Sequence, residues 1–189
     1  LITLVTSTLL TTSVLATPPG YEDLPLGANF AVGDVATSDG VPITFGCFEW
    51  FGGATTCAGA GQIQNEIPGC NSGHRLELSN IVAKYDYAGS IGSQSDPVFA
   101  FGEYGGNINL SINGDFRNFG NMLDVDGMMI GGCEVKVLGG GTGGDCGRVL
   151  FLGTVETLAV GGQEFWWDAT EDCDIDFEDP IYEGVRYNL

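Results

Sequence analysis

Short runs in which apolar and polar side chains alternate fill the body of this chain, and they constrain its fold more than any other feature. Segments 81–87, 107–113 and 133–137 each place apolar residues at every second position. This period of two is typical of β-strands that bury one face. No stretch of the body keeps a helical period of about 3.6 residues for three turns. The pattern therefore predicts strands rather than helices.

Turn-forming residues separate these strand-like runs, and glycine supplies 31 of the 189 residues. Turns are expected at Ser38-Asp39-Gly40, Asn71-Ser72-Gly73, Asn113-Gly114-Asp115 and Gly161-Gly162. Six further strands are expected at 41–48, 74–78, 98–103, 148–152, 155–160 and 164–168. About ten strands in roughly 155 residues predict an all-β fold, namely a two-sheet antiparallel β-sandwich of the jelly-roll type.

The first residues of the chain are expected to lie outside this sandwich. Residues 1–16 carry no charge and end in Val14-Leu15-Ala16, ahead of two prolines. This is the pattern of the apolar segment and cleavage site of a signal peptide, here truncated because it lacks the usual basic start. The alternative is a strand that pairs with the sheet of a neighbouring molecule.

A short match between the two ends of the chain indicates a tandem repeat. The segment that begins at Tyr21-Glu22-Asp23 recurs, with one inserted residue, as the segment that begins at Phe177-Glu178-Asp179. We therefore expect residues 17–176 to form one sandwich repeat and residues 177–189 to begin a second repeat or a linker. Such a chain would be part of a larger extracellular or cell-surface protein.

Six cysteines without a CxxC pair favour disulfides over a zinc site, and disulfides favour a secreted or cell-surface location. Sequence alone does not fix their pairing. We predict two local bonds, Cys47–Cys57 and Cys133–Cys146, and one long-range bond, Cys70–Cys173. The second bond would tie the ends of the glycine-rich stretch 139–144, which we expect to be a flexible loop.

The charge balance is strongly acidic, with 25 acidic and 6 basic side chains and a net charge of −19. Such a surface repels nucleic acid and anionic membranes. We therefore expect no nucleic-acid partner, and no membrane insertion once the signal segment is removed. The acidic excess serves either solubility or the binding of calcium, which prefers several carboxylate and carbonyl oxygens.

Two motifs resemble the ends of a known type of domain. Tyr21-Glu22-Asp23 and Gly161-Gly162-Gln163-Glu164-Phe165-Trp166-Trp167-Asp168 look like the first and last strands of galactose-binding-like jelly rolls, a type that many carbohydrate-binding modules share. Carboxylates at these places often hold a structural calcium ion, so the resemblance implies that Glu22 and Asp168 are calcium ligands. The residues after Asp168 depart from the usual ending. The acidic stretch 172–183 also has the ligand spacing of an EF-hand loop, but Phe177 replaces its turn glycine.

The candidate ligand face is aromatic and amide-rich. Alternation along 164–168 directs Phe165 and Trp167 to one face, which we expect to be the core, and Trp166 to the other. A tryptophan flanked by carboxylates suits a sugar, because the ring covers the apolar CH face and the acids accept hydroxyl hydrogen bonds. The alternative for each residue is structural packing or the wet face of a sheet. The predicted ligand contacts are Trp166, Glu164, Trp50, Asn107 and Asn109.

Catalysis is not expected, because His74 is the single histidine and no nucleophile elbow, HExxH or phosphate loop occurs. We predict a secreted, non-catalytic binding module, for carbohydrate, whose partners are an extracellular glycan or neighbouring repeats. The alternative is a structural repeat of an extracellular fibre or surface layer that assembles by β-strand pairing. A glycoside hydrolase, which needs only two placed carboxylates, is the least favoured class.

Overall fold

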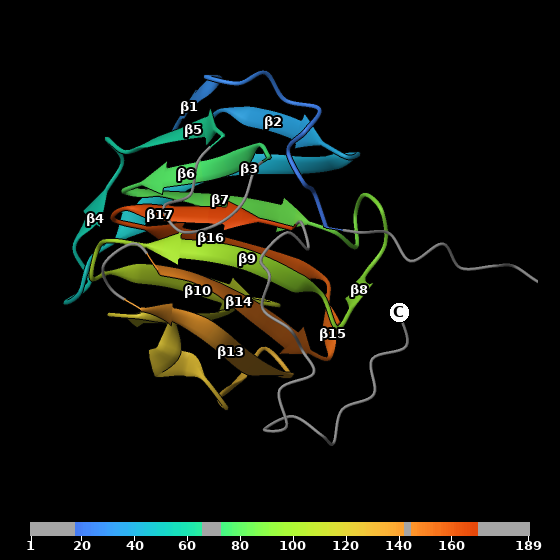
Figure 1. Cartoon of the computed structure of the whole chain (residues 1–189), viewed down its shortest axis with the longest axis vertical. Helices are drawn as coiled ribbons and strands as arrows, with labels where there is room; N and C mark the ends of the chain where they lie inside the picture. The colour runs from blue at the N-terminus through green and yellow to red at the C-terminus, as the bar shows by residue number, and fades with distance from the viewer. Residues whose placement is uncertain (1–17, 66–72, 142–144, 170–189) are drawn as a thin grey trace, which may run out of the picture.

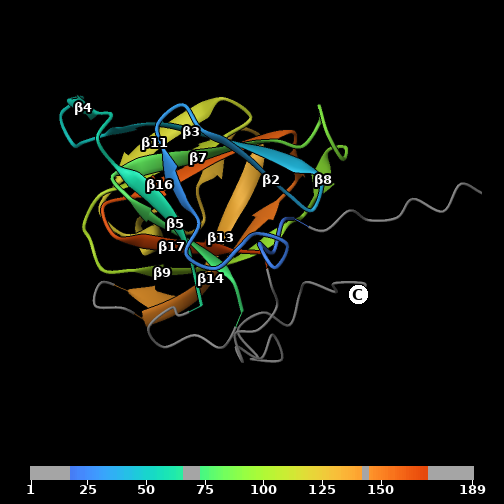
Figure 2. The same cartoon turned by 90° about the horizontal axis from the view of Figure 1, so that it is seen from above.

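The computed structural model describes residues 18–65, 73–141 and 145–169, and these form a sandwich of two antiparallel sheets (Figure 1). Seen from above, the sheets lie as two layers with the core between them (Figure 2). The predicted fold class is therefore confirmed. Within these ranges, no helix is long and apolar enough to cross a membrane.

The first sheet, sheet A, has eight strands, and each neighbouring pair is antiparallel. Their spatial order is β1 (Asn29–Ala31), β5 (Ala60–Gln64), β6 (Arg75–Ser79), β17 (Phe165–Asp168), β9 (Val98–Glu103), β14 (Asp145–Leu152), β13 (Cys133–Gly141) and β12 (Met129–Ile130).

The second sheet, sheet B, faces sheet A across the core. Its strands, in spatial order, are β11 (Asp115–Phe119), β10 (Ile108–Ile112), β16 (Thr157–Gly162), β7 (Ile81–Asp86), β3 (Val41–Glu49) and β2 (Val35–Ser38), with β4 (Thr55–Thr56) paired to the end of β3. A small sheet pairs β8 (Gln94–Ser95) with β15 (Thr154–Val155), and the 3-10 helix η1 (Met122–Val125) precedes β12.

The strand pairing is that of a jelly roll. Four strand pairs, β6–β17, β7–β16, β9–β14 and β10–β11, are nested one inside another along the chain. The chain thus forms one long hairpin that is rolled up. As a result β6, β17, β9 and β14 lie side by side in sheet A, and β7, β16, β10 and β11 lie side by side in sheet B. This arrangement joins strands that are far apart in the sequence.

The core contains the apolar half of each alternating strand. Phe165 and Trp167 point into it, as predicted, and both are fully buried. Trp167 stacks on Phe99 with ring centroids 4.5 Å apart, and Phe165 stacks on Phe101. Full burial of a large apolar side chain stabilises a fold by roughly 1.5–3 kcal/mol. This aromatic layer is therefore a major source of stability.

Two of the predicted turns join strands as expected. Asp39 and Gly40 have φ angles of 49° and 80°, and Asn113 and Gly114 have φ angles of 50° and 81°. Two successive positive φ angles are the mark of the type I′ turn, whose twist matches that of the flanking strands. These turns connect β2 to β3 and β10 to β11.

The prediction of a turn at Gly161-Gly162 is wrong, because both glycines belong to β16. A Cβ atom on Gly161 would lie 2.4 Å from the carbonyl oxygen of Ile81 in the neighbouring strand. The glycine therefore permits close packing of β16 on β7 rather than a change of direction. Most of the expected turn 71–73 lies outside the described residues.

The segment 21–23, expected as a first strand, is a turn. Tyr21 has a φ angle of 62°, and its side chain is fully buried in the core. Its hydroxyl oxygen lies 2.6 Å from the hydroxyl oxygen of Tyr85. Burial raises the pKa of both phenols. The first strand of the described chain is instead β1.

The disulfide Cys47–Cys57 is present, as predicted, but the predicted bond Cys133–Cys146 is wrong. Cys133 is a buried free thiol, whereas Cys146 is disulfide-bonded to another cysteine. The register explains the error. The stretch 139–141, expected as part of a loop, continues β13, so the two cysteines lie at opposite ends of the β13–β14 hairpin. The predicted bond Cys70–Cys173 and the segments 1–16, 172–183 and 177–189 lie outside the described residues.

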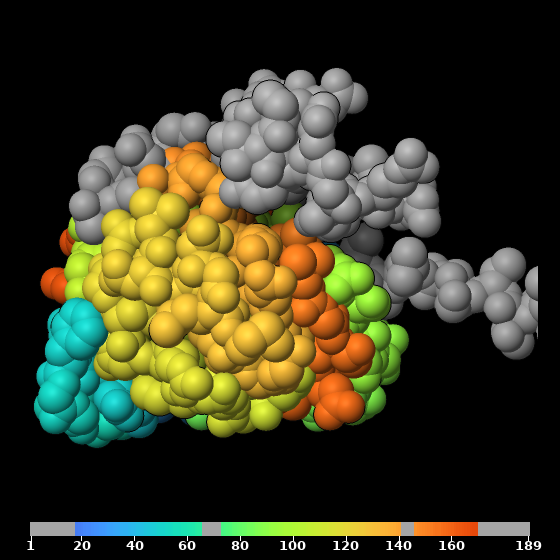
Figure 3. All heavy atoms as spheres, turned by 90° about the horizontal axis from the view of Figure 1, so that it is seen from below, coloured from blue at the N-terminus to red at the C-terminus, as the bar shows by residue number. Residues whose placement is uncertain are grey.

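Glu103 is an acidic side chain that points into the sandwich, in register with Phe165. It is fully buried, and its Oε2 atom accepts a hydrogen bond of 3.1 Å from the backbone N–H of Met122 in η1. Its Oε1 atom has no hydrogen-bond partner among the described residues. The pKa of Glu103 is raised to about 7, mainly by burial and to a smaller extent by the nearby Asp124 carboxylate, while the hydrogen bond from the Met122 N–H acts in the opposite direction. Residues from η1 to β14, coloured yellow to orange, form much of the face shown in Figure 3.

Candidate functional site

The outer face of sheet B is hollowed into a groove of about 790 Å³. Strands β3, β7, β16, β10 and β11 contribute to it. Its volume lies within the range of ligand sites, about 300–1,000 Å³. The polar, charged and aromatic side chains that line it include Thr44, Glu49, Lys84, Asp86, Ser111 and Phe116.

The strand register places one row of side chains across this groove. Along the row Thr44 pairs with Lys84, Lys84 with Ala159, Ala159 with Ser111, and Ser111 with Phe116. These residues alternate with core residues on the same strands, so they point to the outer face. The short side chains leave the middle of the groove open. Phe116, which is 41% exposed, stands at its far end.

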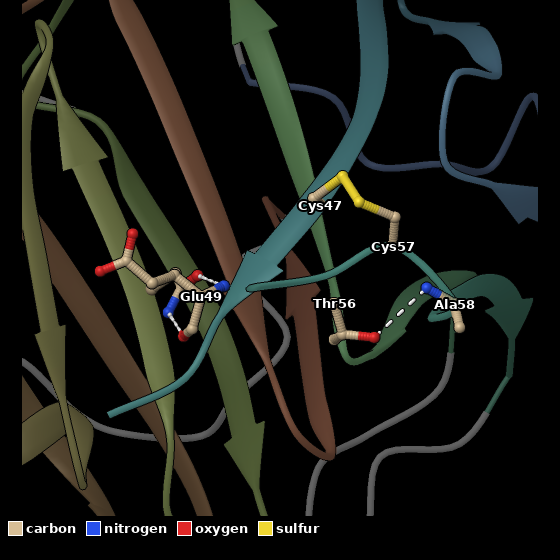
Figure 4. The surroundings of a disulfide bond; sticks show 6 residues. Cys47, Glu49, Thr56, Cys57 and Ala58 are labelled. Carbon is tan, nitrogen blue, oxygen red and sulfur yellow. Dashed lines mark hydrogen bonds between the residues drawn. A yellow bond between two sulfur atoms is a disulfide. The ribbon is translucent and has the colours of Figure 1, made fainter. Parts of the chain in front are cut away.

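The hairpin between β3 and β4 forms one wall of the groove. A disulfide ties Cys47 to Cys57 (Figure 4). Cys47 is also one of the residues that line the groove. Trp50 follows β3 and is half-buried, with its ring packed edge-on against Phe48 at 5.2 Å. Trp50 is not among the groove-lining residues, and its role as a sugar platform stays a prediction. The bond and the aromatic pair stiffen the wall.

Asn107 and Asn109 hold this wall in place and are each only 2% exposed. The Asn109 amide donates to the carbonyl oxygen of Glu49 at 2.7 Å and accepts from the Glu49 N–H at 2.8 Å. The Asn107 side-chain oxygen accepts from the Phe51 N–H at 2.8 Å, and Asn118 donates to the same Glu49 carbonyl oxygen at 2.8 Å. Their side-chain amides are thus hydrogen-bonded to the backbone of Glu49 and Phe51, although Asn109 also lines the groove. Sugar contacts through Asn107 and Asn109 stay a prediction.

Trp166 faces away from the core, as predicted, but it is only 7% exposed. Its indole N–H donates to the Gln64 side-chain oxygen at 3.4 Å, and its ring meets the ring of Tyr104 edge-on at 5.3 Å. Glu164 is exposed. The pKa of Glu77 is raised mainly by the burial of Glu77 itself and also by the negative charge of Glu164. Trp166 is thus a packing residue. Tyr104, 43% exposed, is the open aromatic side chain beside it.

The two predicted calcium ligands have partners within the protein. The exposed Glu22 accepts a hydrogen bond of 2.8 Å from the backbone N–H of His74. Asp168 is fully buried, and its Oδ2 atom lies 3.5 Å from Nη1 of Arg75. In the described part of the chain, no cluster of three or more histidine, cysteine or acidic residues is placed to hold a metal ion. Calcium binding through Glu22 and Asp168 stays a prediction.

Lys84, Ser111 and Phe116 were not predicted as site residues. Lys84 carried a usable signal, because it stands on the polar side of an alternating strand in a chain with only 6 basic residues. Ser111 and Phe116 carried none, because a serine and a phenylalanine are ordinary residues on a strand. Their place in the groove depends on the pairing of β10 with β11 and β16.

Comparison with known proteins gave no match: no family model fits the chain, and no curated protein or solved structure is detectably similar to it. The function is therefore inferred from the geometry of the groove.

Proposed function

We propose that this protein is a secreted, non-catalytic carbohydrate-binding module that holds an oligosaccharide in the groove of sheet B. The observation that carries the proposal is the exposed ring of Phe116 at one end of a groove whose floor bears the hydroxyl groups of Thr44 and Ser111. The jelly-roll fold agrees with the resemblance to galactose-binding-like domains. A fold alone does not define a ligand, so the site carries the argument.

A sugar matches both the apolar and the polar parts of this surface. An aromatic ring covers the CH face of a pyranose, and hydroxyl, carboxylate and ammonium groups exchange hydrogen bonds with sugar hydroxyls. An extended peptide would need a free strand edge to join. The four inner strands under the groove, β3, β7, β16 and β10, are paired on both sides, whereas β11, at the far end, is an edge strand of the sheet in the described chain. A peptide could therefore join the sheet only beside β11 and not along the floor of the groove. This favours a glycan over a peptide.

The rigidity of the groove supports the same function. Its floor is a continuous sheet, and its wall is fixed by the Cys47–Cys57 bond and by the asparagine contacts to Glu49. A preformed site loses little conformational entropy on binding, which helps a shallow groove to hold a polar ligand. A disulfide in the wall also fits an oxidising, extracellular environment.

The substitution Phe116→Ala tests the proposal. We expect it to raise the Kd for the oligosaccharide that binds most tightly on a glycan array by about tenfold, because aromatic packing and ring burial are lost. Titration calorimetry measures the change. The matched control is Tyr104→Ala, which removes a ring of similar exposure, 43% against 41%, from a different part of the surface.

Each outcome of this experiment has a clear meaning. A loss of binding in Tyr104→Ala alone would move the site to the face that carries Trp166. Shorter oligosaccharides released during the titration would identify a glycoside hydrolase. Failure of the unaltered protein to bind any glycan of the array would overturn the proposed function.

A second candidate function is assembly into a fibre or surface layer, and an exposed apolar surface favours it. Leu123, Met128 and Met129 are 46%, 45% and 61% exposed around η1 and β12. β12 is the last strand of sheet A in the described chain, and the edge of a sheet is a place where a strand of another molecule can pair. We propose a second copy of the domain as the partner of this surface. Met129→Lys should then reduce self-association in sedimentation velocity, and a concentration-independent monomer would contradict the idea.

A further inference from the structure

We propose that Lys84 makes the groove specific for an oligosaccharide that carries one carboxylate, such as a single uronic acid unit. This inference rests on the proposed function and names the ligand class of the same site. It follows from where the ammonium group lies, from which groups surround it, and from the charges along the groove.

Gly46 allows the Lys84 side chain to lie down on the floor of the groove. A Cβ atom on Gly46 would be 2.7 Å from Cε and 2.9 Å from Nζ of Lys84. Only a residue without a side chain leaves this space free. Lys84 therefore lies across the neighbouring strand β3 while remaining exposed, and its ammonium group stays within reach of a bound ligand.

The ammonium group of Lys84 has no acidic partner in the described part of the chain. Two other basic residues of the fold differ in this respect: Lys136 pairs with Glu134, and Arg117 pairs with Asp115. No carboxylate of the described residues lies within ion-pair distance of Lys84 Nζ. A lysine ammonium carries three hydrogen-bond donors and no acceptor. A ligand oxygen can accept one of these hydrogen bonds, and the bond is strongest when that oxygen is anionic.

The distance between Lys84 and Phe116 sets the minimum size of the ligand. Lys84 is on β7 and Phe116 is on β11, with β16 and β10 between them. Three strand spacings of about 4.8 Å separate these strands by roughly 14 Å. One sugar ring cannot contact both side chains. An oligosaccharide can stack one unit on Phe116 and place the carboxylate of another unit on Lys84.

The charges along the groove limit the ligand to one negative charge at this point. Glu49 and Asp86 also line the groove, so one cation stands among two acids, in a protein with a net charge of −19. A single carboxylate neutralises Lys84. A second negative charge on the ligand would face Glu49 or Asp86 without a partner, so sulfated and polyuronic chains are disfavoured.

The test compares matched oligosaccharides that differ at one position, with a hydroxymethyl group in one member and a carboxylate in the other. We expect the unaltered protein to bind the acidic member about two- to fivefold more tightly at low salt, as expected for an exposed ion pair. Lys84→Met should abolish this preference. Lys136→Met, which removes the same charge far from the groove-lining residues, should preserve it and so control for the change in net charge.

Gly46→Ala adds a test of position, because it keeps the charge but displaces the ammonium group. We expect it to weaken the preference for the acidic member while Phe116→Ala weakens the binding of both members alike. Equal binding of the two members by the unaltered protein, or a preference that survives Lys84→Met, would overturn this inference and leave the proposed function standing. Binding of neither member, nor of any other glycan of the array, would overturn both.

Discussion

The hydroxyl oxygens of Tyr21 and Tyr85 lie 2.6 Å apart inside the core, where both side chains are almost fully buried. Tyr21 belongs to the turn at the start of the described chain, and Tyr85 to the middle of sheet B. This hydrogen bond therefore fixes the turn that contains Tyr21 to strand β7 of the sandwich. Each hydroxyl group is the hydrogen-bond partner of the other, at a buried position where water cannot take that role.

Tyr21→Phe should destabilise the protein by about 1–2 kcal/mol, because it leaves the Tyr85 hydroxyl buried without its partner. Urea denaturation measures the free energy of unfolding. Tyr104→Phe, at an exposed position, is the control and should have almost no effect. Equal stability of Tyr21→Phe and the unaltered protein would show that this contact does not fasten the chain.

The buried Glu103 predicts an unusual dependence of stability on pH. Its pKa of about 7 in the fold exceeds the ordinary value of 4.5, so the folded protein holds a proton that the unfolded chain has released. The contribution of Glu103 is fully present below pH 4.5 and is lost as the pH rises through 7. Other carboxylates titrate as well, so the test compares a variant with the unaltered protein.

Glu103→Gln should raise the free energy of unfolding by about 2–3 kcal/mol at pH 8 and change it little at pH 4, because the amide stays neutral at both. The glutamine oxygen can still accept from the Met122 N–H. Glu164→Gln is the control at an exposed position. A change of the same size at both pH values would contradict the assignment of a buried, protonated carboxyl.

Trp166 and Trp167 are neighbours on β17 with opposite orientations, and both should be costly to truncate. Trp167→Ala should cost about 3–5 kcal/mol, as a core cavity does. Trp166→Ala should cost about 2–3 kcal/mol, because its ring is buried against Tyr104 although it lies outside the core. Denaturant unfolding of both variants measures these values. A Trp166→Ala variant as stable as the unaltered protein would restore Trp166 as an open ligand platform.

Calcium binding by Glu22 and Asp168 has its own test. Millimolar calcium should raise the melting temperature by binding the folded state alone, and both Glu22→Gln and Asp168→Asn should abolish the rise. Moderate salt in the buffer screens the general attraction of calcium to an acidic surface. Identical melting curves with calcium and with a chelator would argue against the site. Asp168→Asn should also lower stability without calcium, because it weakens a buried ion pair with Arg75.

Alternation predicted most of the long strands because it is a local property of the chain. The alternating runs 81–87 and 107–113 correspond to β7 and β10 to within one residue at each end. Short strands such as β4, β8 and β12 have only two residues each, which is too few to show a period. The type I′ turns at Asp39 and Asn113 were predictable because their Asp-Gly and Asn-Gly pairs are also a local property of the chain.

The groove was not predictable because it depends on contacts between distant strands. Alternation shows that Trp166 points away from the core, but it cannot show that Tyr104 and Gln64 pack against that outward ring. Alternation also places Asn109 among the polar positions of its strand. It cannot show that the Asn109 side-chain amide is hydrogen-bonded to the backbone of Glu49, 60 residues earlier. The face of a side chain is a local property, whereas its exposure depends on tertiary structure.

Mapping the ligand contacts by NMR tests the central claim most directly. Amide chemical shifts of the labelled protein are followed while the tightest-binding oligosaccharide of the array is added. The account predicts that the largest changes occur on the outer face of sheet B, at Lys84, Ser111 and Phe116. Changes centred instead on Trp166, Tyr104 and Glu77, with sheet B unaffected, would contradict it.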